Sequence, residues 1–194
     1  VLYQAGSSGR GQAFAARHAE CVFVSSQTKE GLRKLVAEVR ESVAREGRNP
    51  RDIKFFMGVT AVVGRTQAEA REKHAEYLRY ANPEAGLAHY ASSTGIDFSR
   101  YGAQEPIRYV KNNAIESAVK NLTVTRTDRT VTDLLADMAL GGRYPALVGS
   151  AAQVADELES WVAETDIDGF NLARTVTPEC YGDFIDLVIP ELQS

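Results

Sequence analysis

Residues 53–64 read IKFFMGVTAVVG, and residues 66–70 directly after them read TQAEA. The first run is apolar with Gly58 inside it, which predicts a strand from Ile53 to Val63. Thr66 followed three residues later by Glu69 is the reciprocal capping pair that begins a helix. A strand that leads directly into a helix is the repeating unit of α/β proteins.

The same unit occurs twice before residue 53. Residues 1–4 are β-prone and run through a glycine-rich loop into a short helix expected over residues 12–18. Residues 21–24, CVFV, are apolar on both faces, as buried parallel strands are. Thr28 is a plausible N-cap for the next helix, which has apolar residues at helical spacing. The alternation favours an α/β fold with a parallel sheet and right-handed helical crossovers.

Residues 82–130 interrupt this alternation. They predict a long irregular connection, and its aromatic residues Tyr90, Phe98, Tyr101 and Tyr109 favour an ordered one. Beyond it we expect helices over residues 130–140 and 151–164, a last strand over 169–173 and a closing segment from Pro178.

The chain therefore contains about four βα units with an insertion before the last strand. A closed barrel takes eight such units, so four could make a small open sheet or half of a barrel. Because Val1 begins in the middle of an apolar stretch, we expect a cut end and favour the half barrel.

The composition excludes several classes of protein. With 22 Lys and Arg against 26 Asp and Glu, the formal charge is −4, which argues against nucleic-acid binding. The apolar runs are far shorter than the roughly 20 residues that cross a bilayer, so we expect no membrane span. Cys21 and Cys180 form neither a disulfide framework nor a zinc-type spacing, which favours the cytoplasm.

The loop from Gly6 to Gly11 is the first candidate for a binding site. Its free amide groups, the hydroxyls of Ser7 and Ser8 and the following helix N-terminus could together hold a phosphate. The GxGxxG and GxxxxGK[ST] patterns are both absent, so spacing alone favours a tight turn with Ser8 as a helix cap. Arg10 could assist a phosphate or be a solvated side chain.

Other candidates for chemistry are weaker. His18, His74 and His89 have no acid or cysteine at a metal-like spacing, and we expect ordinary surface groups. No catalytic triad or carboxylate pair is evident, and we predict no metal site.

Several stretches together resemble the bacterial-luciferase-like flavin monooxygenases. They are residues 3–8 (YQAGSS) with 15–20 (AARHAE), residues 58–70, residues 148–156 (VGSAAQVAD) and residues 168–172 (DGFNL) with 183–193. Within that family the chain is most similar to the group of nitrilotriacetate, dibenzothiophene-sulfone and long-chain alkane monooxygenases. The resemblance spans nearly the whole chain.

The resemblance implies a luciferase-like (β/α)8 TIM barrel, of which residues 1–194 would be the C-terminal half. It implies an FMNH2- and O2-dependent monooxygenase that acts on a small organic substrate through a flavin hydroperoxide. A separate NAD(P)H:flavin reductase would supply the reduced FMN, and the fragment alone would be inactive. The FMN phosphate would be held by Gln4, Ala5, Gly6, Ser7 and Ser8, and residues 82–130 would lie near the substrate mouth. We also expect a homo-oligomer.

Two alternatives stay open at this point. One is a stand-alone α/β anion-binding or interaction domain without redox activity, which would be a folded monomer. A half barrel would instead expose a broad apolar sheet. The other is a luciferase-like barrel that uses a deazaflavin in place of FMN.

Overall fold

The computed structural model describes residues 1–5, 8–107, 130–140 and 144–194 of the chain. These residues form two compact units. The first joins Val1–Arg79 to Tyr144–Ser194, and the second is Tyr80–Arg143. The two units are described separately below.

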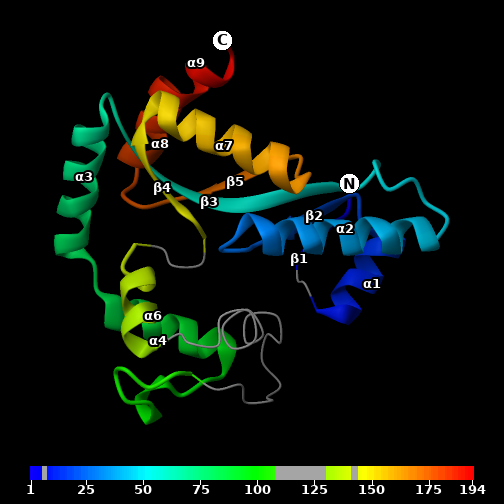
Figure 1. Cartoon of the computed structure of the whole chain (residues 1–194), viewed down its shortest axis with the longest axis horizontal. Coiled ribbons are helices and arrows are strands. Elements are labelled where there is room, and N and C mark those ends of the chain that lie inside the picture. Colours follow the sequence, from blue (N-terminus) through cyan, green and yellow to red (C-terminus); the bar gives the residue numbers. More distant parts are fainter. Residues whose placement is uncertain (6–7, 108–129, 141–143) are drawn as a thin grey trace. The chain divides into compact units, whose positions relative to one another are not determined.

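The first unit is built on a parallel five-stranded sheet (Figure 1). Its strands are β1 (Tyr3–Ala5), β2 (Cys21–Val24), β3 (Lys54–Gly64), β4 (Ala146–Ser150) and β5 (Gly169–Ala173). β1 pairs with β2, β2 with β3, and β3 with both β4 and β5, all in parallel. The predicted α/β class with a parallel sheet is confirmed.

The long strand β3 organises this sheet. Residues 54–57 pair with β2, residues 56–60 with β5 and residues 60–64 with β4. Every residue from Met57 to Gly64 is buried, which explains why the strand is apolar almost throughout. β4 was not predicted, so the expected order of elements along the chain was wrong. The insertion precedes the last two strands, not the last one.

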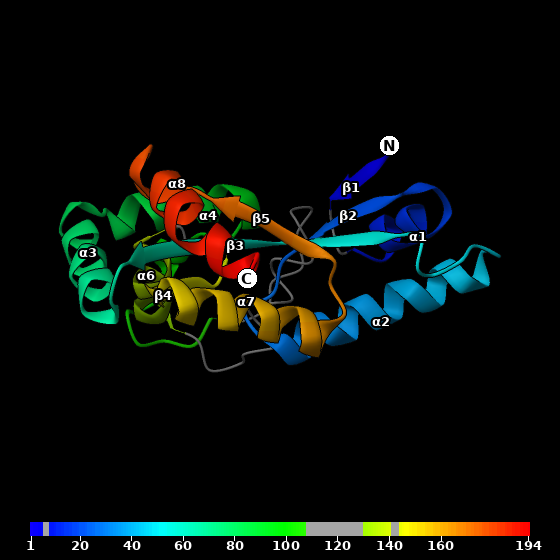
Figure 2. The same cartoon turned by 90° about the horizontal axis from the view of Figure 1, so that it is seen from above.

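Helices cover one face of the sheet. The first unit contains α1 (Gly9–His18), α2 (Lys29–Arg45), α3 (Gln67–Tyr80), α7 (Ala151–Thr165), α8 (Glu179–Asp183), the π-helix η2 (Phe184–Val188) and α9 (Ile189–Leu192). Figure 2 shows α2 and α7 along the same side of β3. Alternate β3 residues, Phe55, Met57 and Val59, pack with these helices in the main core. We call this the outer face.

The opposite face of the sheet, the inner face, has a different character. Strand alternation places Phe56, Gly58 and Thr60 there, and the register aligns Phe23 beside Phe56. The ring of Tyr3 stacks on that of Phe23 at 5.4 Å, and Phe23 lies 6.3 Å from Phe56. Tyr3 is 57% and Phe23 39% exposed. The described residues of this chain therefore leave an aromatic row uncovered.

The second unit corrects the expectation of an irregular connection over residues 82–130 for residues 82–107, since residues 108–129 lie outside the described part of the chain. The helix expected over residues 130–140 is confirmed. The second unit contains α4 (Pro83–Thr94), the 3-10 helix η1 (Phe98–Arg100) and α6 (Val131–Met138). Asn82 caps α4 by accepting from the Ala85 N–H at 3.0 Å, and Gly95 ends it with φ 66°. The unit has its own apolar cluster of Ile96, Phe98, Ile107, Val131 and Leu134.

Candidate functional site

The predicted phosphate loop connects β1 to α1. Gly6 and Ser7 lie outside the described residues, so the structure places only Gln4, Ala5 and Ser8. The Ser8 Oγ accepts from the Gly11 N–H at 3.2 Å and caps α1, and the Gln4 side-chain amide donates to the Ala5 carbonyl at 3.1 Å. The simpler interpretation, a turn closed by a serine cap, is thus present in the structure.

The same geometry also suits an anion. Amides in the first turn of α1 have no acceptor within the helix, and the helix dipole makes that end positive. The first turn carries no acidic residue. Apart from the neighbouring residues and the backbone of α1 itself, no heavy atom of the described residues lies within 4 Å of where a Cβ on Gly9 would be. Among the described residues, the Ser8 hydroxyl hydrogen has no acceptor, because the Oγ is used only as an acceptor. A phosphate oxygen could accept this hydrogen.

A second serine-capped helix provides a comparison within the same unit. Ser150 follows β4 and caps α7, but Gln153 closes a reciprocal capping box there. The Ser150 N–H and hydroxyl both donate to the Gln153 Oε1, at 3.0 and 3.3 Å. The Ser150 donors at α7 are therefore occupied, whereas the Ser8 hydroxyl hydrogen at α1 has no acceptor within the described part of the chain.

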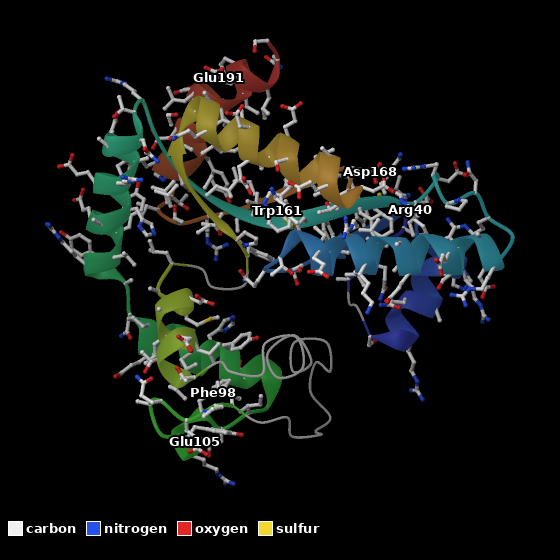
Figure 3. The ribbon with its side chains drawn as sticks, viewed as in Figure 1. Arg40, Phe98, Glu105, Trp161, Asp168 and Glu191 are labelled. Atoms are coloured by element: carbon white, nitrogen blue, oxygen red, sulfur yellow. The ribbon has the colours of Figure 1, made fainter. Side chains whose placement is uncertain are left out.

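The conspicuous cluster of charges lies at the other end of the sheet. Arg40 donates to Asp166 at 2.7 Å, and Asp168 accepts from Lys54 at 3.0 Å and from the Phe55 N–H at 2.9 Å. Figure 3 shows Arg40 and Asp168 close together. These groups surround the amino ends of β3 and β5. In barrels that end contributes stability, and chemistry takes place at the carboxyl end.

Asp166 in this cluster has a shifted pKa. Partial burial alone would raise the pKa of Asp166, but the hydrogen bond from Arg51 and the charges of Arg40 and Arg51 outweigh it. The pKa therefore lies below its usual value, and the carboxylate is held ionised by two guanidinium groups.

The histidines show no site geometry. His18 lies at the end of α1, with its ring 4.9 Å from that of Phe14, while His74 lies in α3 and His89 in α4. Nowhere in the described ranges do three His, Cys, Asp or Glu side chains gather as they would around a metal ion. In the same residues no helix is long and apolar enough to cross a membrane.

One residue on the inner face, at the middle of β3, was missed by sequence reasoning. The ring of Tyr144 lies directly on Gly58, where an added Cβ would come 2.1 Å from a ring carbon. The next residue, Pro145, accepts from the Thr60 N–H at 2.9 Å. The available signal was Gly58 inside an apolar strand, because such a glycine often marks a place where another part of the chain comes close to the strand.

The four aromatic residues predicted near a substrate mouth fall in the second unit. Tyr90 and Phe98 stack at 6.1 Å, and Tyr90 and Tyr101 pack against the unit's own apolar cluster. Tyr109 lies outside the described residues. A pocket role for these side chains stays a prediction.

Comparison with known proteins agrees with the parallel sheet and its helices. The chain is 42% identical to the dimethyl-sulfide monooxygenase of Hyphomicrobium sulfonivorans and 40% identical to the long-chain alkane monooxygenase of Geobacillus thermodenitrificans. Both alignments cover all of this chain but only 41% and 40% of those proteins. The crystal structure of a riboflavin lyase with modified FMN and riboflavin superposes with a TM-score of 0.89 at 35% identity, covering 100% of this chain and 42% of that one.

The chain spans about two fifths of the length of these relatives. Over residues 2–168 it also matches the family model described as luciferase-like monooxygenase. That match covers most of the chain, including β1, its loop and the whole of β3. Its parallel strands and covering helices are those of half a luciferase-like TIM barrel. The chain therefore belongs to the luciferase-like monooxygenase family.

Proposed function

We propose that residues 1–194 are the C-terminal half of one luciferase-like barrel domain in an FMN-dependent monooxygenase, and that the loop after β1 holds the FMN phosphate. The observation that carries this proposal is the N-terminus of α1 after a parallel strand, where the Ser8 hydroxyl hydrogen has no acceptor among the described residues, in a chain of this family. Gln4, Ala5, Gly6, Ser7 and Ser8 would form the phosphate site.

The residues present fit a phosphate group. Ser8 can donate its hydroxyl hydrogen while its Oγ still accepts from Gly11. The open space at Gly9 lets an oxygen approach the first amides of α1. Neutral donors of this kind hold a dianion without a neighbouring lysine.

Reduced FMN bound there would supply the electrons with which one atom of O2 enters a small organic substrate. The task of this chain is then to fix the position of the cofactor and to keep water away from it. A separate NAD(P)H:flavin reductase would deliver the reduced flavin, in the cytoplasm. Residues 82–130 would be the insertion near the substrate mouth.

The inner face supports a half barrel over a stand-alone domain. Tyr3 and Phe23 are large apolar side chains left exposed on the sheet, although Val22 and Val24 on the other face of β2 are packed in the main core. A complete small domain would cover such a row, and in a barrel the interior side chains of the remaining strands cover it.

The test is a comparison of FMN with riboflavin, which lacks the phosphate. In the full-length protein, Ser8→Ala should weaken FMN binding about tenfold or more, since a hydrogen bond to a charged group contributes roughly 1.5–3 kcal/mol. Riboflavin binding should not change. Ser150→Ala is the matched control, because it removes the same type of cap at α7, where the donors are already used.

Fluorescence titration measures both affinities. Equal losses for FMN and riboflavin with Ser8→Ala would show that Ser8 only stabilises α1. Absence of FMN binding by the unsubstituted full-length protein would end the proposal altogether. Oxygen uptake with reduced FMN then tests the monooxygenase reaction itself.

A further inference from the structure

We propose that Arg48 is a positioning residue for the FMN phosphate, and that it acts by fixing α1 from its carboxyl end. This inference rests on the function proposed above and adds a residue at the other end of α1 from the phosphate loop. Arg48 lies in the connection from α2 to β3, and α1 runs from the carboxyl end of β1 back toward the amino end of β2.

The Arg48 guanidinium satisfies the carboxyl end of α1. It donates to the carbonyl oxygens of Ala16 at 2.8 Å and Ala19 at 2.7 Å, and more weakly to that of Ala15 at 3.3 Å. The last carbonyls of a helix have no N–H partner within it. The backbone at Ala19 is extended, so α1 lacks the left-handed glycine that closes many helices. Arg48 supplies that cap, with a positive charge where the helix dipole is negative.

The backbone of Arg48 is itself held by the end of α2. Gly47 has φ 75° and donates its N–H to the Ala44 carbonyl at 3.0 Å. The Arg48 N–H donates to the Val43 carbonyl at 3.2 Å. This pair of bonds is a Schellman motif, which ends a helix in a defined geometry. The Arg48 side chain therefore extends from a fixed point on α2 to the end of α1.

The first turn of α1 depends on this attachment. The buried residues of α1 are Ala15 and Ala16, and both lie in its second half. Gly9 and Arg10, in the first turn, are exposed. Gly9 and Gly11 also lower the helix propensity there, and a helix of 10 residues is marginal by itself. Contacts near the carboxyl end of α1 therefore determine where its first turn lies within this chain.

The length of α1 makes the phosphate contacts sensitive to its anchoring. Its 10 residues span about 15 Å, so a tilt of about 4° at the Arg48 contact moves the first turn by about 1 Å. A shift of that size breaks a hydrogen bond, because donor–acceptor distances vary by only a few tenths of an ångström. Riboflavin has no phosphate, and its binding would not depend on the first turn of α1 in the proposed site.

The test compares the FMN and riboflavin affinities of the full-length protein by fluorescence titration. Arg48→Ala should weaken FMN binding about tenfold, the effect of losing one hydrogen bond to a charged group, and should leave riboflavin binding unchanged. Arg48→Lys keeps the charge without the planar fork, so its FMN affinity should be intermediate. Arg45→Ala is the matched control and should not change FMN affinity, because Arg45 donates to Ser42 within α2, at 2.9 Å.

Two further measurements separate positioning from stability. Hydrogen exchange without flavin should be about tenfold faster at the amides of residues 12–18 in Arg48→Ala, and unchanged there in Arg45→Ala. The double variant Ser8→Ala with Arg48→Ala should bind FMN about as weakly as Ser8→Ala alone, because both changes remove the same phosphate contact.

Four results would overturn the inference. They are equal losses of FMN and riboflavin affinity in Arg48→Ala, an unchanged ratio of the two affinities, unchanged exchange in α1, and additive losses of FMN affinity in the double variant. If Arg48→Ala does not fold, the same comparisons with Arg48→Lys decide between these outcomes. Absence of FMN binding by the unsubstituted protein would contradict the proposed function and this inference with it, whereas normal FMN binding with an unchanged ratio contradicts this inference alone.

Discussion

Replacing Arg40 by alanine should destabilise the protein by about 2–6 kcal/mol, because two carbonyl groups in a partly buried place lose a charged donor. The Arg40 side chain is only 11% exposed. Its guanidinium donates to the Asp166 carboxylate at 2.7 Å, to the Asp166 carbonyl at 2.9 Å and to the Pro50 carbonyl at 2.6 Å. It also lies 4.9 Å from the centre of the Phe55 ring.

The magnitude follows from what the alanine would leave behind. The carbonyls of Pro50 and Asp166 lose their donor in a partly buried place, and each unsatisfied group costs about 1–3 kcal/mol. Asp168, whose Oδ2 lies 3.5 Å from the guanidinium, keeps Lys54 as a partner and adds little. Arg40→Lys keeps the charge but loses the planar fork, so it should cost about half as much.

Urea unfolding of the full-length protein, followed by circular dichroism, measures these differences from the midpoint at constant slope. Arg17→Ala is the matched control, since Arg17 is 61% exposed and pairs with Glu46 on the surface. Its loss should cost less than about 1 kcal/mol. Equal destabilisation by Arg40→Ala and Arg17→Ala would refute the structural role assigned to the buried cluster.

Three more predictions concern stability. The pKa of Asp166 is lowered from 3.8, because Arg51 and Arg40 outweigh its partial burial, so its contribution is complete above that pH and is lost as the pH falls through the folded pKa. Asp166→Asn should flatten the acid limb of a plot of unfolding midpoint against pH, and an unchanged limb would contradict this. Ser150→Ala should cost about 1 kcal/mol in thermal unfolding, as loss of an N-cap does; no loss would mean that Gln153 alone satisfies the end of α7. Gly64→Ala should cost more than about 1 kcal/mol by overpacking, because its Cβ would lie 2.5 Å from the Ala70 nitrogen; a neutral result by urea unfolding would contradict the close packing.

The sequence predicts best those elements whose signal is local. The helix capped by Thr28 occurs as expected, with the Thr28 Oγ1 accepting from the Gly31 N–H at 3.2 Å. The strand at β3 and the helix after it are also confirmed, with bounds shifted by a residue or so. In these elements propensity, capping and apolar spacing all favour one structure.

The elements that were missed depend on distant contacts. α4 contains Gly86 in its interior, and a Cβ there would come 2.8 Å from the Met138 carbonyl oxygen, so the helix fits closely against α6. β4 is short and exists through pairing with β3, as in the register of Leu147 with Ala61. Neither contact leaves a periodic pattern in the local sequence, because each depends on residues far away along the chain.

The candidate site could be predicted only where its geometry depends on local sequence. Ser8 belongs to a local strand–loop–helix motif, so its cap could be anticipated from neighbouring residues alone. Whether the Ser8 hydroxyl hydrogen has an acceptor could not be predicted in this way. Ser150 caps α7 in a closed capping box with Gln153, whereas Ser8 caps α1 without one. Tyr144 could not be anticipated either, because only the fold brings it onto Gly58.

The two faces of β3 connect these observations. Phe55, Met57 and Val59 are fully packed by helices of this chain, so the outer face accounts for the apolar residues at odd positions. Between them lies Phe56, which is equally apolar although the described chain leaves it only half-buried. A strand selected only for the outer face would carry polar residues there. Phe56 and the exposed rings of Phe23 and Tyr3 beside it therefore fit the interior of a barrel, where the side chains of further strands would cover them.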